Sequence, residues 1–325
     1  MTTPPDWRRI QLQNFHSWEK LALFLQLQDP YKDELLQKSS FPLNLPYRLA
    51  EKIAKNTLED PILKQFVPLK KELILNENFV LDPVQDASFR KESKLIHKYQ
   101  GRALLVTSSA CAMHCRYCFR KNFSYETKRK DFEEELKTLE NDTSISELIL
   151  SGGDPLSLSN EDLKNLLTSL IPLTHIKRVR FHTRFPIGIP ERIDEEFLSI
   201  LEKIPKQFFF TIHTNHPKEL DADIFSALKK VARLGIPLLN QTVLLQGVND
   251  SVPVLEELFS LLSDHGIIPY YLHHLDPVTG TTHFATSEDQ GKDLMRQLSK
   301  KLSGYSLPKY VKEVPGQSSK TPIWY

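Results

Sequence analysis

The sequence has few cysteines, no long apolar run and no excess of charge of either sign. Only three cysteines occur in 325 residues, so disulfide bonds cannot be the framework of the fold. No stretch approaches the ~20 apolar residues that cross a bilayer. The opening residues, MTTPPDWRRI, also lack the apolar segment of a secretory signal. We therefore predict a cytoplasmic protein without a membrane partner.

The charge of the chain is balanced. Its 42 basic and 41 acidic side chains leave a formal net charge of +1, so no global positive field attracts a nucleic acid. One basic stretch comprises Arg116, Arg120, Lys121, Lys128, Arg129 and Lys130. The acidic segment DFEEELKTLE follows it at once and cancels the local field. We predict no nucleic-acid partner, and a non-enzymatic iron–sulfur or zinc module that binds nucleic acid is the distant alternative.

The pattern of apolar residues divides the chain into three parts. Residues 1–95 have helical spacing interrupted by prolines, which predicts a helical N-terminal extension. Six β-rich runs then alternate with amphipathic segments of helical length: 102–107, 146–151, 177–183, 207–213, 237–245 and 267–274. They predict an α/β fold over residues 96–304, a partial (β/α)6 TIM-like barrel, with an open doubly wound sheet as the alternative. Residues 305–325 are expected to form a short C-terminal tail.

Parallel α/β folds bind ligands beyond the carboxyl ends of their strands. Residues that are suited to ligand binding or catalysis follow the predicted strands at that end. The cysteines follow the first strand, and the later strands are followed by Gly152, Gly153, Asp154, Arg184, His213, His273, His274 and Asp276. We therefore expect one site at this end of the sheet.

The three cysteines lie within CAMHCRYC, as Cys111, Cys115 and Cys118. Three closely spaced thiolates on one loop can hold three irons of a [4Fe–4S] cube and leave the fourth iron open for a small molecule. A structural zinc site normally needs four ligands, and the chain has no second cysteine pair. His114 would complete a zinc set only with strained local geometry, so an iron–sulfur cluster is the favoured interpretation.

The cysteine spacing, with Tyr117 just before the last cysteine, resembles the signature of radical S-adenosylmethionine (SAM) enzymes. The resemblance implies that SAM chelates the open iron and that an electron from the cluster splits SAM into a 5′-deoxyadenosyl radical. A reducing partner such as flavodoxin or ferredoxin would supply that electron. The SGGDP segment, with Ser151, Gly152, Gly153 and Asp154, looks like the glycine-rich motif that contacts SAM in this superfamily. Tyr117 and Gln241 are further expected cofactor contacts.

Several segments between about residue 95 and Lys320 together resemble the lysine 2,3-aminomutase family: HCRYCFRKNF, SGGDPLSLS, TIHTNHPKEL, NQTVLLQGVND and PYYLHHLDPVTGTTHF. In that family a lysine in a Pro-Gly-rich turn near the C terminus binds pyridoxal 5′-phosphate covalently, and Lys320 in PGQSSK matches it. The resemblance makes Lys320 the catalytic residue. It also places Lys98 and Arg102 near the cofactor phosphate.

Three further residues are expected to bind the substrate amino acid. By resemblance Arg120 grips its α-carboxylate through a two-pronged contact, while Asp276 and Glu313 receive the remote ammonium of lysine. The family has aspartate where this chain has Glu313, and the added methylene changes the shape of the pocket. A substrate such as glutamate is disfavoured, because the two acids would repel its side-chain carboxylate.

The chain has no cysteine after Cys118, unlike the free-lysine mutases of the family. It resembles the short members that make (R)-β-lysine from (S)-α-lysine, which a separate lysine ligase attaches to elongation factor P. A catabolic free-lysine 2,3-aminomutase is the alternative. The sequence leaves a homo-oligomer open.

Overall fold

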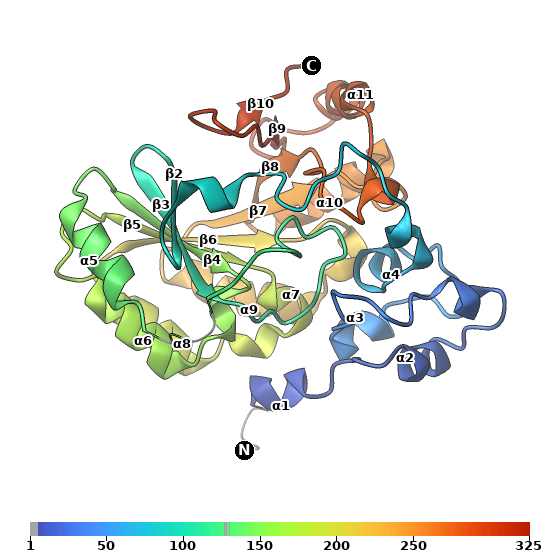
Figure 1. Ribbon diagram of the computed structural model, residues 1–325, viewed down its shortest axis with the longest axis horizontal. Coiled ribbons are helices and arrows are strands. Elements are labelled where there is room, and N and C mark those ends of the chain that lie inside the picture. Colours follow the sequence, from blue (N-terminus) through green and yellow to red (C-terminus); the bar gives the residue numbers. More distant parts are fainter. Residues whose placement is uncertain (1–5, 127–128, 130) are drawn as a thin grey trace.

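The computed structural model describes residues 6–126, 129 and 131–325, and its strands in that range form one ten-stranded sheet ordered β1 to β10 along the chain (Figure 1). The strands are β1 (Arg90–Glu92), β2 (Leu95–Tyr99), β3 (Arg102–Ser108), β4 (Glu147–Gly152), β5 (Arg178–Thr183), β6 (Gln207–His213), β7 (Leu238–Val243), β8 (Ile268–His273), β9 (Lys309–Lys312) and β10 (Thr321–Pro322). Strands β3 to β9 are parallel, and antiparallel pairs add β1, β2 and β10 at the two ends. The barrel is therefore partial.

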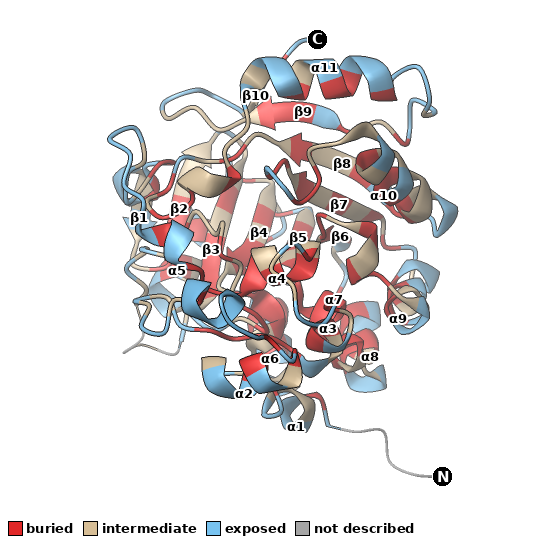
Figure 2. Cartoon of the chain, turned by 90° about the vertical axis from the view of Figure 1, so that its right-hand side faces the viewer, coloured by how far each residue is buried: buried red, intermediate tan, exposed pale blue. Residues whose placement is uncertain are grey.

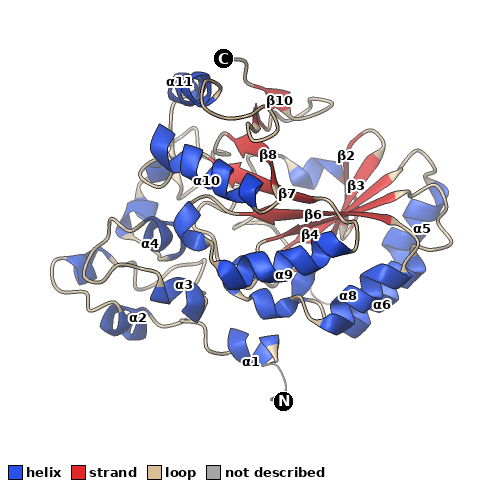
Figure 3. Cartoon of the chain, turned by 180° about the vertical axis from the view of Figure 1, so that it is seen from behind, coloured by secondary structure: helices blue, strands red, loops and turns tan. Residues whose placement is uncertain are grey.

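Helices precede the barrel and then alternate with its strands. They are α1 (Trp7–Gln11), α2 (Trp18–Phe24), α3 (Tyr47–Glu51), α4 (Pro61–Phe66), α5 (Glu133–Asn141), α6 (Asn160–Ser169), α7 (Phe185–Gly188), α8 (Glu195–Lys203), α9 (Ala222–Arg233), α10 (Val252–Asp264) and α11 (Glu288–Leu298). Helices α5, α6, α8 and α9 cover the outer face of the sheet (Figure 3). None of the helices in the described residues has the length and apolar character needed to cross a bilayer.

Helix α9 shows why these segments are helical and where they stop. Its buried residues, Ile224, Ala227, Leu228 and Val231, follow the 3.6-residue period of one helix face. The helix begins after Asp221, whose carboxylate accepts hydrogen bonds from two backbone amides of the first turn. It ends before Gly235, which has a φ of +74° and supplies the left-handed residue that closes many helices.

Apolar and polar side chains alternate along β5 and at the end of β6. In β5 and β6 the apolar set is buried in the main hydrophobic core: Val179, Phe181, Phe208, Phe210 and Ile212. The intervening set lines an interior cavity together with residues of β7 and β8: Arg180, His182, His213, Gln241 and His273. Since successive side chains of a strand point to opposite faces, this register buries apolar groups under the helices and leaves a polar lumen. Figure 2 shows the buried strands within the helical layer.

The N-terminal segment with α1 to α4 packs beside the barrel (Figure 1, blue). Its apolar side chains, such as Leu21, Leu63 and Phe66, belong to the same core cluster as the barrel strands. Strand β1 lies within the expected N-terminal extension, β2 crosses its expected boundary after residue 95, and β9 adds a seventh parallel strand within the expected tail. The predicted α/β class and partial barrel are confirmed, with six parallel strands close to the predicted runs. The short strands β1, β2, β9 and β10 were not predicted.

Candidate active site

A cavity of about 410 Å³ opens at the carboxyl ends of the barrel strands. Every residue to which the sequence analysis gave a role in the site lines it: Lys98, Arg102, Cys111, Cys115, Tyr117, Cys118, Arg120, Ser151, Gly152, Gly153, Asp154, Gln241, Asp276, Glu313 and Lys320. These residues come from six strands or the loops after them, the cysteine loop and the tail. Their individual roles stay predictions. His274, which was also expected at this end of the sheet, lies outside the cavity lining, and its Nδ1 is 2.8 Å from the Tyr310 hydroxyl oxygen.

The cysteine loop follows β3 and lies directly on the end of β4. The backbone amide of Gly153 donates to the carbonyl of Ser108 at 2.6 Å, and that of Asp154 to the carbonyl of Ala110 at 2.7 Å. A Cβ atom on Gly153 would lie only 2.3 Å from the Ala110 carbonyl oxygen. Glycine is therefore required where the strand end meets the loop.

The three thiols are partly buried, and their raised pKa values keep them protonated at neutral pH without a metal. Burial raises the pKa of Cys111 and Cys115, and it raises the pKa of Cys118 to about 11. Metal binding would therefore release protons. Among the described residues no three His, Cys, Asp or Glu side chains converge on a single ion, but a [4Fe–4S] cube binds each thiolate to a different iron and needs no such convergence. The donor set fits an iron–sulfur cluster.

Arg184 lies between the cysteine loop and a buried polar network. Its guanidinium donates to Cys115 Sγ at 3.4 Å, to Gln65 Oε1 at 2.9 Å and to Glu219 Oε2 at 2.5 Å. The Asp154 carboxylate accepts hydrogen bonds from the backbone amide of Arg184 and from three other groups nearby. The Asp154 side chain is therefore committed to holding the loop after β5.

The N-terminal segment holds the cysteine loop from outside. Arg116, between the second and third cysteines, is fully buried, and its guanidinium donates to both carboxylate oxygens of Glu72 at 2.7 and 2.6 Å. The same guanidinium donates to the carbonyl of Phe41 at 2.7 Å. Lys121 contacts Glu72 at 3.3 Å. A buried carboxylate thus anchors the loop through two cations.

Further bonds from this segment fix the backbone of the loop. Asn14 donates to the carbonyl of Ala112 at 2.8 Å, and Asn44 donates to that of Cys111 at 3.2 Å. His114, the residue considered as a zinc ligand, places its Nδ1 2.8 Å from the carbonyl oxygen of Pro42. Burial lowers the pKa of His114. Its ring is therefore engaged with the N-terminal segment.

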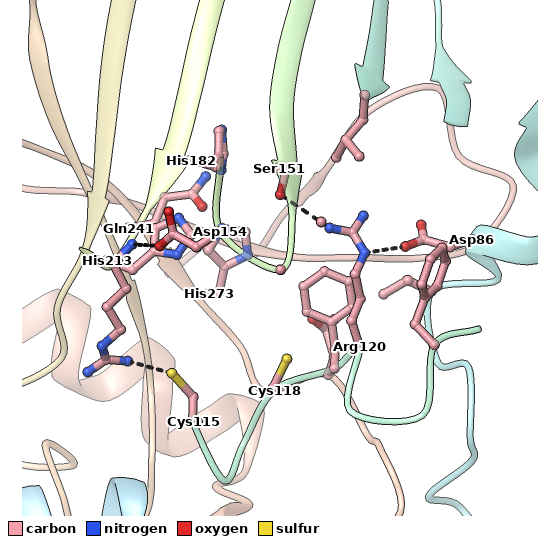
Figure 4. A pocket seen from close by; sticks show the side chains of 18 of the residues that line it. Asp86, Cys115, Cys118, Arg120, Ser151, Asp154, His182, His213, Gln241 and His273 are labelled. Carbon is pink, nitrogen blue, oxygen red and sulfur yellow. Dashed lines mark hydrogen bonds and ion pairs between the residues drawn. The ribbon is translucent and has the colours of Figure 1, made fainter. Parts of the chain in front are cut away.

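Three imidazoles form one side of the cavity, and Figure 4 shows them opposite Arg120. They belong to His182, His213 and His273, and their Nε2 atoms are buried without a hydrogen-bond partner among the described residues. Burial lowers the pKa of His213 to about 3 and lowers the other two pKa values well below the usual range. Buried polar atoms normally have partners, so these neutral rings are suited to contact a bound ligand.

Gln241, from β7, lies beside the imidazoles (Figure 4). The side chain of its neighbour Asn240 bonds to the backbone of Thr214 and to the hydroxyl of Thr242. Asn240 therefore joins adjacent strands, whereas Gln241 is presented to the cavity.

Arg120 crosses the opposite side of the cavity. Its Nε donates to Asp86 at 2.8 Å and its Nη1 to the hydroxyl of Ser151 at 3.3 Å (Figure 4). Asp86 thus fixes the guanidinium through Nε and Ser151 contacts Nη1, which leaves Nη2 and the second hydrogen of Nη1 for a carboxylate. This geometry suits the two-pronged contact expected from the sequence.

A cluster of charges lies next to Arg120. The buried Glu313 carboxylate accepts hydrogen bonds from Tyr99 at 2.5 Å, Lys98 at 3.0 Å and Lys320 at 3.1 Å. Burial raises the pKa of Glu313, but these three donors outweigh burial and hold it below the usual value. Burial raises the pKa of Asp276 to about 7. No group in the described part of the chain donates a recorded hydrogen bond to the Asp276 carboxylate.

The two residues expected at the cofactor phosphate differ in availability. Lys98 is 9% exposed in its side chain and already contacts Glu313 and the carbonyl of Val84. Arg102 lies over the ring of Tyr99, with its Cζ 4.6 Å from the ring centroid, and lines the cavity. Arg102 is therefore the freer cation of the two.

The basic stretch is mostly committed to the fold. Lys128 and Lys130 lie outside the described residues. Arg116 and Lys121 contact Glu72, Arg120 contacts Asp86, and Arg129 contacts Glu134 and Glu135. The described cations of the stretch are thus paired within the chain.

Several cavity residues were not singled out from the sequence. Arg180 and His182 occupy alternate positions of β5, and the period of that strand would have found them. Asp86 and Tyr99 also line the cavity, and no motif marks them. The same holds for Glu72, which lies outside the cavity lining and anchors the cysteine loop. Their contacts arise only when the chain is folded.

The Radical SAM superfamily model matches residues 105–259, from the middle of β3 into α10. The fold and the cysteine loop therefore define a radical SAM enzyme, and this class implies a [4Fe–4S] cluster and SAM. Among solved structures, that of Streptococcus suis SuiB bound to S-adenosylmethionine is 18% identical, with a TM-score of 0.49, over 67% of this chain and 51% of that chain.

Curated relatives extend over nearly the whole chain. The L-lysine 2,3-aminomutase of Escherichia coli (strain K12) is 38% identical over 289 residues, or 88% of this chain and 84% of the relative. The L-lysine 2,3-aminomutase of Haemophilus influenzae is 36% identical over 321 residues, or 97% and 95%. The chain belongs to the lysine 2,3-aminomutase family of isomerases. The resemblance seen in the sequence is confirmed.

Proposed function

We propose that this chain is a pyridoxal phosphate-dependent aminomutase that converts (S)-α-lysine to (R)-β-lysine for the modification of elongation factor P. One observation carries the core of the proposal: the three cysteines and Lys320 line the same cavity. Relatives that are named L-lysine 2,3-aminomutase support lysine as the substrate. A reducing partner such as flavodoxin or ferredoxin would supply electrons.

The cofactor sites follow from the side chains. Cys111, Cys115 and Cys118 would hold the cluster, and the backbone of the SGGDP segment and Gln241 would contact SAM. Lys320 would bind the pyridoxal phosphate, with Arg102 near its phosphate. When bound, the cluster and SAM would supply a radical that removes a hydrogen atom from the substrate. The pyridoxal group would supply a carbon atom that stays bonded to the nitrogen while it migrates.

The chain orients the amino acid from both ends. The Nη edge of Arg120, fixed by Asp86, binds the α-carboxylate. Asp276 and Glu313 receive the side-chain ammonium, and the two acids disfavour a substrate with a second carboxylate. The neutral imidazoles line the wall without adding charge, and the largely enclosed cavity keeps water from a reactive radical.

The test is an anaerobic assay with chiral product analysis. Reconstituted, reduced protein is incubated with SAM, pyridoxal phosphate and L-lysine, or with L-glutamate, L-alanine or L-arginine as comparison. We expect (R)-β-lysine from L-lysine and no β-amino acid from L-glutamate. Reconstituted protein with stoichiometric zinc and no iron would refute the radical mechanism.

The role in translation needs a separate experiment. Mass spectrometry of elongation factor P from cells with and without the gene should show the β-lysyl mass only when the gene is present. Unchanged modification in the deletion strain, together with lysine-dependent growth defects, would favour the catabolic free-lysine mutase instead.

A further inference from the structure

The chain between α4 and β1 exposes a set of apolar side chains, which we call the 73–81 patch (Figure 1). Its members are Leu73 (62% exposed), Ile74 (56%), Leu75 (81%), Val80 (46%) and Leu81 (65%). A turn closed by a hydrogen bond from the Phe79 amide to the Asn76 carbonyl reverses the chain between Leu75 and Val80, so the two halves of the patch lie near each other. Single exposed apolar residues are common, but a contiguous set marks a surface that binds another protein.

The patch is fixed to the barrel and does not fray from it. The backbone amide of Val80 donates to the carbonyl of Pro277 at 2.9 Å, and the carbonyl of Val80 accepts from the amide of Thr279 at 3.0 Å. The hydroxyl of Thr279 also donates to the carbonyl of Phe79 at 3.0 Å. These bonds tie the patch to the loop after β8, so its apolar side chains stay in solvent while its backbone is held in place.

The inner side of the same segment contacts the cysteine loop. Glu72, one residue before the patch, accepts hydrogen bonds from Arg116, which directly follows Cys115. Phe79 packs in a small apolar cluster with Tyr117, which directly precedes Cys118. A segment that faces solvent on one side thus contacts the neighbours of two cysteines on the other.

Three exposed lysines, which we call the lysine rim, border the patch. Lys70 and Lys71 directly precede it, and Lys38 is next to Ser39, whose hydroxyl accepts from Arg116 Nη2 at 3.1 Å. No ion pair is recorded for these three lysines in the part of the chain that the structure describes. Within residues 70–81, all of them described, Glu77 is the one exposed acid. An apolar centre with a positive rim is complementary to an acidic protein.

We propose that an acidic one-electron carrier protein docks on the 73–81 patch and the lysine rim and reduces the iron–sulfur cluster from there. The inference deepens the proposed function, because it assigns a surface to the reducing partner that this function needs. Electron transfer slows steeply with distance, so the donor has to bind where the cysteine loop lies just beneath the surface. Small, weak contacts are typical of electron-transfer partners, and a patch of this size suits one.

The redox step is balanced by one electron. The flavin or iron–sulfur group of the carrier loses the electron, and the cluster held by the three cysteines gains it. No bond between the two proteins forms or breaks. The carrier then leaves in its oxidised form, which a short-lived contact permits.

The experiment measures the rate of cluster reduction in reconstituted, SAM-bound protein by anaerobic stopped-flow absorbance. Reduced flavodoxin and reduced ferredoxin are the protein donors, and dithionite is the small donor that needs no docking surface. The double variant Lys70→Glu, Lys71→Glu should be reduced by the protein donor about tenfold more slowly at low salt, and the difference should shrink as salt is added. Its reduction by dithionite should equal that of the wild type.

A second double variant tests the apolar centre without changing charge. Leu75→Ser with Leu81→Ser should raise Kd for the carrier about tenfold, since two leucines lose their contact with it. Matched controls lie on the outer helices of the barrel. Lys164→Glu with Lys229→Glu alters two exposed lysines of α6 and α9, and it should be reduced as fast as the wild type.

Cross-linking locates the contact independently of any rate. A carbodiimide joins carboxylates of the carrier to amines of this chain, and mass spectrometry identifies the joined peptides. We expect cross-links at Lys38, Lys70 or Lys71. Cross-links confined to other lysines would overturn the proposal.

Three kinetic results would also overturn the proposal: no reduction of the wild type by either carrier, wild-type rates in both double variants, or an equal loss with dithionite. Leu75→Ser with Leu81→Ser might instead break a dimer while carrier-driven reduction stays unchanged. The patch would then bind a second copy of the chain, and the proposal would be wrong. Size-exclusion chromatography with light scattering detects this outcome.

The result is separable from the proposed function, because dithionite can drive turnover without a carrier. If dithionite-reduced wild type makes β-lysine while the patch variants accept electrons from the carrier normally, the docking surface is wrong and the function stands. If the patch variants lose only carrier-driven reduction while dithionite-reduced wild type makes no β-amino acid, the docking surface stands and the function fails.

Discussion

The two ends of the cavity are built differently. At the cysteine end, the buried Arg116 and Glu72 and the backbone bonds from Asn14 and Asn44 hold the loop from outside. At the other end, Lys320 lies on an exposed turn of the tail and Asp276 has no recorded partner in the described residues. The chain therefore pre-forms the cluster site and leaves the amino-acid end to be completed by its ligands.

The largest effects should come from removing one functional group at each end. Cys115→Ser should lose the cluster iron and all turnover, yet keep a borohydride-reducible pyridoxal chromophore. Lys320→Ala should do the reverse, with full iron content and no such chromophore. Iron analysis, electron paramagnetic resonance and absorbance after borohydride reduction check both variants. Loss of iron in Lys320→Ala would show that the two ends are not independent.

The anchor of the cysteine loop gives the next effect. Glu72→Gln leaves the buried Arg116 without its carboxylate, which should cost about 3–5 kcal/mol of the free energy of unfolding. Urea denaturation measures that loss, and faster loss of iron to a chelator reports the loosened loop. Glu288→Gln, at a half-exposed ion pair, is the control and should cost less than about 1 kcal/mol. Equal losses in the two variants would contradict the anchoring role.

The amino-acid end should respond to pH. Burial raises the pKa of Asp276 to about 7, and protonation below this value removes the charge that attracts an ammonium. We therefore expect KM for lysine to rise as the pH falls from about 8 to about 6, by up to about tenfold per pH unit below the pKa. The neighbouring imidazoles stay neutral over this range, because burial lowers their pKa values. Asp276→Asn should bind lysine weakly at every pH, and a persistent pH dependence in that variant would place the titration elsewhere.

The smallest effect concerns a helix cap remote from both ends. The Ser17 hydroxyl accepts a hydrogen bond from the Lys20 amide at 3.3 Å and begins α2. Ser17→Ala should lower the free energy of unfolding by about 1 kcal/mol without changing iron content or lysine affinity. Thermal unfolding gives the first quantity. A drop in iron content would mean that even the outer turns of the N-terminal segment control the cysteine loop.

Much of the site was accessible from the sequence because its signals are local. The cysteine spacing lies within eight residues, and short β-rich runs that alternate with amphipathic segments of helical length mark the parallel sheet. Lys320 and Arg120 followed from motifs shared with a family. Strand β9 has only four residues, KYVK, which is too short for a period to stand out, and its place is decided by pairing with β8.

The partners of these residues could not be found in the same way. Glu72 and Arg116 are 44 positions apart, and Lys98 and Glu313 are 215 apart. No local pattern encodes such pairs, because closure of the barrel and docking of the N-terminal segment create them. Glu313 illustrates this. The sequence predicted that it contacts the substrate, and the structure shows that its oxygens already accept hydrogen bonds from Lys98, Tyr99 and Lys320.

The attachment of the cysteine loop to preceding residues also bears on how the protein matures in the cell. Glu72, Asn44 and Asn14 leave the ribosome before the first cysteine does, so their cradle is synthesised ahead of the thiols that it holds. The contacts of the loop with β4 and Arg184 can form only later, because these residues follow the cysteines in the chain.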